Sequence, residues 1–121
     1  MAKTLNLENF RLKTTSDIPV KSIPEIASVY IVNENNFPAL ADITCYTLEV
    51  WEECMRIPHW HANASELGYV ISGTIEVMIW RSPGETAVFT LTAGMCWFIP
   101  QAALHSLNNI GSTHAQLLVG F

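Results

Sequence analysis

A chain of 121 residues corresponds to one domain, and with half of its residues hydrophobic it can form a packed core. Its six basic residues stand singly in a chain of net charge −5, which excludes the basic patch of a nucleic-acid-binding protein. No run approaches the roughly 18 apolar residues needed to span a bilayer, and no apolar segment follows the first lysine as in a signal peptide. Three irregularly spaced cysteines favour a reducing compartment. We therefore expect a cytoplasmic protein with no nucleic-acid or membrane partner.

Residues 1–28 are more polar than the rest of the chain and include Pro19 and Pro24. They predict an irregular N-terminal arm containing one short strand or helical turn at most. Only 14% of the residues are charged, which favours an oligomer whose interface covers apolar surface. An unpaired edge strand is prone to pair with another chain. We therefore expect a homodimer in which the arm is exchanged between the two copies.

Residues 29–121 form a series of short β-rich runs separated by turn residues. Ser72-Gly73 and the stretch 82–85 (Ser-Pro-Gly-Glu) are typical of tight turns, and no run has the pattern of an amphipathic helix. The predicted strands are 29–32, 43–50, 67–71, 74–80, 87–91, 95–99, 104–108 and 115–121. Many short strands with frequent turns predict an all-β antiparallel barrel of jelly-roll type.

Three histidines and one glutamate have the spacing of metal ligands. His59 and His61 lie two residues apart, so in a strand their side chains point to the same face. Glu66 begins the next predicted strand, and His105 would complete the site from a distant segment. Three nitrogens and one carboxylate oxygen suit Mn²⁺, Fe²⁺, Co²⁺, Ni²⁺, Cu²⁺ or Zn²⁺ rather than Mg²⁺ or Ca²⁺. Such a set leaves up to two positions of an octahedral ion open to substrate, water or O₂.

Neighbouring residues give further expectations. Trp60 should point away from the two histidines into packing, and Gly68, on the same face as Glu66, should leave space above the ion. Cys54 is an additional candidate ligand, although the other four already complete a set. A His-x-His pair alone is weak evidence, because buried histidines often bond to backbone carbonyls instead. His114, in a polar turn, has only that interpretation.

The segments around these ligands resemble the two sequence motifs of the cupin family. The first motif, from its histidines onward, is matched by His59-Trp60-His61, then Glu66 after four further residues, and Gly73 after six more. The second motif is matched by Gly94, Pro100, Gln101, Ala102, His105 and Asn109. Glu53 and Ala102 stand where the motifs usually have glycine, a difference that concerns turn conformation rather than ligation. The resemblance implies a cupin-type double-stranded β-helix that binds a metal through His59, His61, Glu66 and His105.

The stretch 55–66 looks like the corresponding stretch of the oxalate decarboxylase-like cupins. Those domains have an arginine three residues before the first histidine, and their site holds manganese with the arginine facing the bound oxalate. This resemblance implies that Arg56 anchors a small carboxylate substrate and that the metal is Mn²⁺, although the same ligands accept Fe²⁺, Ni²⁺ or Zn²⁺. A guanidinium pairs with a carboxylate through two parallel hydrogen bonds. Because Pro58 interrupts the strand, alternation leaves open whether Arg56 faces the site or the solvent.

In the decarboxylases a flexible lid follows the last barrel strand and carries the glutamate that acts as general acid. Here residues 115–121 match that last strand, and on this resemblance we expect no counterpart of the lid. Decarboxylation needs a proton donor within reach of the reacting carbon. Three hypotheses follow: an Mn- or Fe-dependent enzyme similar to oxalate decarboxylase or oxidase, a non-catalytic metal-containing cupin that binds a small molecule, and an isomerase or oxygenase of another cupin branch.

Overall fold

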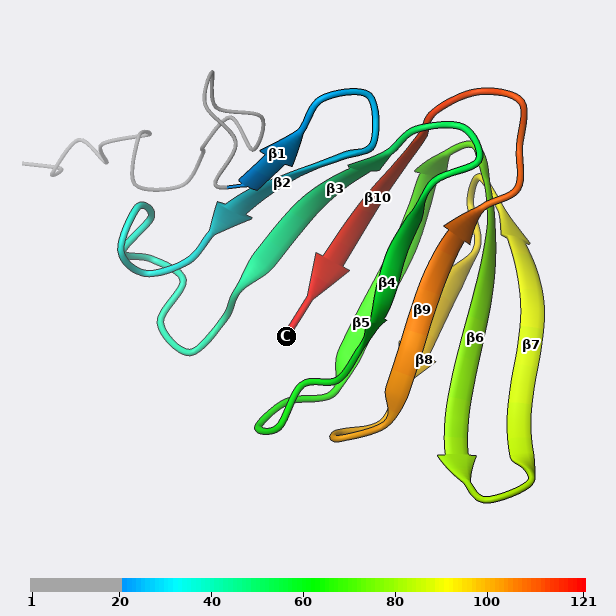
Figure 1. Ribbon diagram of the computed structural model, residues 1–121. Coiled ribbons are helices and arrows are strands. Elements are labelled where there is room, and N and C mark those ends of the chain that lie inside the picture. Colours follow the sequence, from blue (N-terminus) through cyan, green and yellow to red (C-terminus); the bar gives the residue numbers. More distant parts are fainter. Residues whose placement is uncertain (1–20) are drawn as a thin grey trace, which may run out of the picture.

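The computed structural model describes residues 21–121, which form ten strands and no α-helix (Figure 1). No helix long and apolar enough to cross a membrane occurs in this part of the chain. The strands are β1 (Lys21–Ile23), β2 (Ala27–Val32), β3 (Cys45–Val50), β4 (Met55–His59), β5 (Glu66–Ser72), β6 (Thr74–Ser82), β7 (Glu85–Thr92), β8 (Cys96–Ile99), β9 (Leu104–Asn109) and β10 (Ala115–Gly120).

The strands form two antiparallel sheets. The larger sheet has the order β1-β2-β3-β10-β5-β8, and the smaller one has the order β4-β9-β6-β7. Strands far apart in sequence are therefore neighbours: β10 lies between β3 and β5, and β9 lies between β4 and β6 (Figure 1). This arrangement confirms the predicted all-β jelly-roll fold.

The core consists of side chains that alternate along the strands. In β6, Ile75, Val77 and Ile79 are buried, while the residues between them are only partly covered. In β10, Leu117 and Val119 are buried and Leu118 is exposed. Burying such aliphatic side chains stabilises the fold by about 1.5–3 kcal/mol each. The period of two explains why the sequence predicts strands so clearly here.

The N-terminal arm is described in part. β1 pairs with β2 of the same chain, and β2 pairs in turn with β3, so residues 21–32 extend the larger sheet. Residues 1–20, most of the predicted arm, lie outside the described residues. The exchange of the arm between two copies therefore stays a prediction.

The two positions that depart from the cupin motifs adopt the backbone conformation that favours glycine. Glu53 has a φ of 58° and Ala102 has a φ of 61°. In this left-handed region the Cβ atom of a non-glycine residue is crowded by the backbone. The local fold of the motifs is therefore kept although the glycines are absent.

Replacing Ala102 by glycine is expected to raise the free energy of unfolding by roughly 0.5–1 kcal/mol, because relief of the strained φ outweighs the added flexibility of the unfolded chain. Urea denaturation measures the change. Ala87→Gly, at an exposed position within β7, is the control and is expected to lower the free energy of unfolding. Equal destabilisation by the two changes would contradict the argument.

Candidate metal centre

The four predicted ligands converge, although they come from three different strands and a loop. Their ligating atoms all lie within 4.8 Å of one another. Glu66 and His105 are buried, and the other two side chains are partly buried. We call these four residues the ligand cluster: His59, His61, Glu66 and His105.

The pairing of β4 with β9 places two of these ligands side by side. Its register shifts between Arg56 and His59, so that His59 lies directly opposite His105. Pro58, which has no backbone N–H, lies within this irregular stretch. Beyond β4, the carbonyl of His61 accepts a hydrogen bond of 2.9 Å from the N–H of Ala102. The loop that carries His61 is thus held against the turn that leads into β9.

Backbone hydrogen bonds determine which nitrogen of two histidines faces the centre. Nδ1 of His59 lies 2.8 Å from the carbonyl oxygen of Ile57, and Nδ1 of His105 lies 2.9 Å from that of Ala103. A carbonyl only accepts, so Nδ1 carries the proton in each ring. In the neutral imidazole Nε2 then has a free lone pair, the form that binds a metal.

The distances within the ligand cluster fit a bound cation. Oε2 of Glu66 lies 3.1 Å from Nε2 of His61 and 3.2 Å from Nε2 of His105. Metal–ligand bonds of roughly 2.0–2.2 Å put neighbouring ligands of an octahedral ion about 3 Å apart. An unprotonated Nε2 and a carboxylate oxygen repel each other at this distance unless a proton or a cation lies between them. The donor set and its spacing therefore fit a divalent transition metal.

Trp97 holds the carboxylate of Glu66 in place. Its indole Nε1–H donates a hydrogen bond of 2.8 Å to Oε1 of Glu66, which leaves Oε2 directed at the histidines. Gly68 and Trp97 are neighbours across β5 and β8, and a Cβ atom at position 68 would overlap the indole ring. The sequence-based expectation that Gly68 leaves space above the ion is therefore wrong, because the indole fills that space. Trp97 itself was not predicted as a site residue.

Three other residues singled out in the sequence lie outside the ligand cluster. Trp60 was expected to pack inside, but its side chain is 62% exposed. β4 ends at His59, so Trp60 lies beyond the end of the strand, and residues 21–121 leave most of it uncovered. Cys54 packs against the core and is not part of the ligand cluster. His114 stacks on Trp51, with ring centroids 5.9 Å apart, and is likewise separate from the cluster.

Burial and charge set the protonation of the cluster. Burial lowers the pKa of His59 to about 4, and it also lowers the pKa of His61, against the attraction of Glu66. Burial also disfavours the charged forms of Glu66 and His105, but the hydrogen bond between the two side chains outweighs this effect of burial. The hydrogen bond from the Trp97 N–H further stabilises the ionised carboxylate of Glu66. The pKa of Glu66 is thus below its usual value and that of His105 above it. At neutral pH the cluster holds an ionised carboxylate and two neutral imidazoles, the forms that bind metals.

A small cavity of about 20 Å³ lies beside the ligand cluster, and it has room for about one water molecule. It is lined by Tyr46, Leu48, Arg56, His59, His61, Glu66, Leu107, Val119 and Phe121. Arg56 thus lies on the wall of the same cavity as three of the predicted ligands. Its positive charge contributes to the lowered pKa of His59 and His61. Within residues 21–121 Arg56 forms no salt bridge with a carboxylate.

Sequence comparison finds relatives among oxalate decarboxylases and germin-like proteins. The chain is 32% identical to the oxalate decarboxylase OxdC of Bacillus subtilis over 102 residues, which are 84% of this chain and 26% of that protein. It is 34% identical over 87 residues to Germin-like protein 1 of Brassica napus, which are 70% of this chain and 42% of that protein. The chain thus spans about a quarter of the length of the decarboxylase that it matches.

Solved structures show the same relationship. A structure of the B. subtilis oxalate decarboxylase, from work on its Mn(II) centres, superposes with a TM-score of 0.79 at 33% identity. The superposition covers 85% of this chain and 27% of that one. A structure of an oxalate decarboxylase from work on its substrate binding mode gives a TM-score of 0.80 over 87% of this chain. The sequence profile described as Cupin matches residues 10–121, nearly the whole chain. The protein is a member of the cupin family.

Proposed function

We propose that the ligand cluster binds a divalent transition metal, Mn²⁺ in the first place, and that the protein acts on a small carboxylate in the manner of an oxalate decarboxylase or oxidase. One observation carries the proposal: Arg56 lines the cavity onto which three of the four ligands open. The oxalate decarboxylase relatives and the Mn(II) centres of the B. subtilis enzyme support the choice of substrate and metal.

Each wall of the cavity has a role in this proposal. The metal, when bound, supplies a Lewis acid with open positions for a carboxylate oxygen. Arg56 binds the remaining carboxylate oxygens through parallel N–H donors and so orients the substrate. Leu48, Leu107 and Val119 form an apolar wall that keeps water away from this charged pair. A low local dielectric strengthens the attraction between the guanidinium and an anion.

The experiment uses the protein purified without metal and then loaded with Mn²⁺. Decarboxylase activity converts the oxalate monoanion into CO₂ and formate, and oxidase activity with O₂ produces CO₂ and H₂O₂. Formate and H₂O₂ are measured separately between about pH 4 and 8, the range over which carboxylates and histidines titrate. Metal-free protein is the control. The absence of both products throughout this range would overturn the oxalate proposal.

A second candidate function is a metal-containing cupin that binds a small carboxylate without converting it. It is favoured by the lining of the inner cavity, where Glu66 is the only carboxylic acid among the described residues. Glu66 is already a proposed ligand, so no other carboxylic acid there can deliver a proton. Calorimetry distinguishes the two functions: tight binding of oxalate without product would support the binding protein.

We also propose that the protein is a homodimer in which an apolar outer sheet face is covered. Four large apolar side chains on the outer side of β5, β8 and β10 are 40–59% exposed: Leu67, Tyr69, Phe98 and Leu118. Leu67 pairs with Phe98, and Tyr69 pairs with Leu118, so these four side chains form one patch. Contiguous exposed apolar patches are typical of association sites.

Light scattering is expected to give the mass of a dimer for the natural sequence and of a monomer for Phe98→Glu. The substitution puts an uncompensated charge into the proposed interface. Val88→Glu, at another exposed apolar position in β7, is the matched control and is expected to leave the dimer intact. A monomeric natural protein would contradict the proposal.

A further inference from the structure

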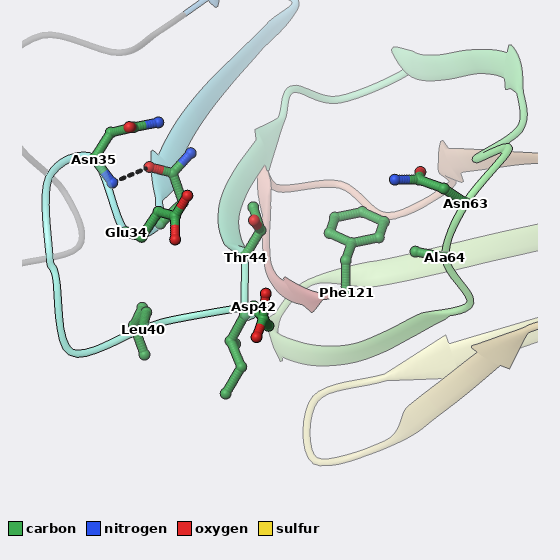
Figure 2. A pocket seen from close by; sticks show the side chains of 10 residues that line it. Glu34, Asn35, Leu40, Asp42, Thr44, Asn63, Ala64 and Phe121 are labelled. Carbon is green, nitrogen blue, oxygen red and sulfur yellow. Dashed lines mark hydrogen bonds between the residues drawn. The ribbon is translucent and has the colours of Figure 1, made fainter.

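Three cavities meet at the side chain of Phe121. The small cavity beside the ligand cluster is the innermost. A second cavity, of about 210 Å³, is lined by Thr44, Tyr46, His61, Asn63, Ala64 and Phe121. A third, of about 360 Å³, opens further out between the loop that carries Glu34 and Asp42 and the loop that carries Asn63 (Figure 2). Phe121 lines all three, so its ring lies between the outer space and the ligand cluster.

The ring is held by two aromatic neighbours. Its centroid lies 4.4 Å from that of the His61 imidazole and 4.8 Å from that of the Tyr46 phenol, with tilted planes in both cases. The backbone of Phe121 exchanges hydrogen bonds of 2.9 and 3.3 Å with that of Thr44. The main chain is therefore fixed to Thr44, the residue just before β3, so the ring can move only by rotation about the side-chain bonds of Phe121. Each aromatic contact contributes about 0.5–1.5 kcal/mol, so displacing the ring has a modest cost.

The inner cavity is too small for a carboxylate substrate while the ring is in this position. Its volume of about 20 Å³ accommodates about one water molecule, whereas even formate has three heavy atoms and oxalate has six. The cavities on the other side of Phe121 are at least ten times larger. A ligand reaching the cluster by this route has to displace the ring.

We propose that Phe121 determines which carboxylates reach the metal, by closing the route from the outer cavities to the ligand cluster. A short carboxylate needs a small displacement of the ring, and a longer one needs the ring to leave its contacts with His61 and Tyr46. The resulting selection is by size, and it acts on the rate of ligand binding rather than on the metal affinity. The inference depends on the proposed function only in that the ligand cluster holds a metal.

The experiment follows ligand binding to the protein loaded with Co²⁺, whose absorption spectrum changes when an anion enters its coordination shell. Formate, oxalate and succinate are mixed with the protein in a stopped-flow instrument. Phe121→Ala is expected to raise the association rate constant at least tenfold for oxalate and succinate, with a much smaller increase for formate. Phe121→Trp is expected to slow the two longer ligands. Phe89→Ala, which truncates a phenylalanine of β7 that lines none of the three cavities and lies outside the proposed dimer interface, is the control and should leave all rates unchanged.

Cobalt affinity equal to that of the natural protein verifies that the Phe121 variants fold. Unchanged rates in Phe121→Ala, or an equal increase for all three anions, would overturn the role of Phe121 in selection by size. These rates do not involve turnover. If Phe121→Ala changes the association rates as expected but the natural protein makes no product from oxalate, only the enzymatic function is contradicted. If the natural protein converts oxalate but Phe121→Ala leaves the association rates unchanged, only the proposed role of Phe121 is contradicted.

Discussion

Replacing Glu66 by glutamine is expected to lower the affinity of the protein for Mn²⁺ at least 100-fold while leaving the fold intact. Losing a residue that merely supports a ligand already reduces metal affinity about 10- to 100-fold, and here the only anionic ligand loses its charge. The amide has the shape of the carboxylate and keeps an oxygen for the indole N–H of Trp97. Its NH₂ group can donate to the lone pairs on Nε2 of His61 and His105, so the metal-free cluster stays hydrogen-bonded.

Isothermal titration of the metal-free protein with Mn²⁺ measures this change, and electron paramagnetic resonance reports whether the ion occupies an ordered site. His114→Ala is the control, because this histidine lies against Trp51 and outside the ligand cluster. Trp97→Phe, which removes the hydrogen bond to Glu66 and part of the indole ring that packs over Gly68, is expected to weaken binding by about tenfold. Binding by Glu66→Gln as tight as that of the natural protein would contradict the proposed site.

The local part of the site was predictable from sequence. His59 and His61 are two residues apart, and alternation along an extended chain places them together without any long-range information. Glu66 and His105 are 39 residues apart, so no local rule joins them. Their convergence was predicted through the spacing of the cupin motifs, which encodes the register of the sheets.

The parts that escaped prediction depend on pairing between distant strands. The contact of Trp97 with Glu66 follows from the register of β8 on β5, in which Trp97 lies beside Gly68. A glycine on the same strand face as a metal ligand predicts that another group packs closely against the backbone there. It does not predict which side chain that group belongs to. Phe121 has no sequence signal at all, because its role depends on where β10 ends relative to the His61 loop.

Arg56 shows why structure was needed to complete the sequence argument. Pro58 and the register shift between Arg56 and His59 break the alternation that would otherwise give the direction of the side chain. The sequence therefore left a cavity-facing and a solvated arginine as alternatives. In the structure Arg56 lines the inner cavity. Its proposed role in substrate binding can therefore be tested by replacing it and measuring kcat/KM for oxalate.

Replacing Arg56 by alanine is expected to lower kcat/KM for oxalate by two to three orders of magnitude, with little change in Mn²⁺ affinity. Truncating one partner of a buried, hydrogen-bonded charge pair costs about 2–5 kcal/mol of binding. Among the described residues, Arg56 is the only arginine or lysine that lines the inner cavity, so oxalate would lose that partner. Arg56→Lys should recover only part of the loss, because an ammonium cannot form two parallel bonds to a carboxylate. Where turnover is absent, the Kd of oxalate for the Mn²⁺-loaded protein is measured instead.

The matched control is Arg81→Ala, because Arg81 is exposed in β6 and does not line the inner cavity. It should leave kcat/KM for oxalate and metal affinity unchanged, which separates a local contact from the general effect of removing a positive charge. Arg56→Ala with natural kcat/KM would show that the guanidinium does not bind the substrate, and the likeness to oxalate decarboxylases would then extend to the fold and the ligand cluster only. A loss of Mn²⁺ affinity in the same variant would instead assign Arg56 to the structure of the site, since a neighbouring cation disfavours a bound metal ion and its removal should not weaken binding.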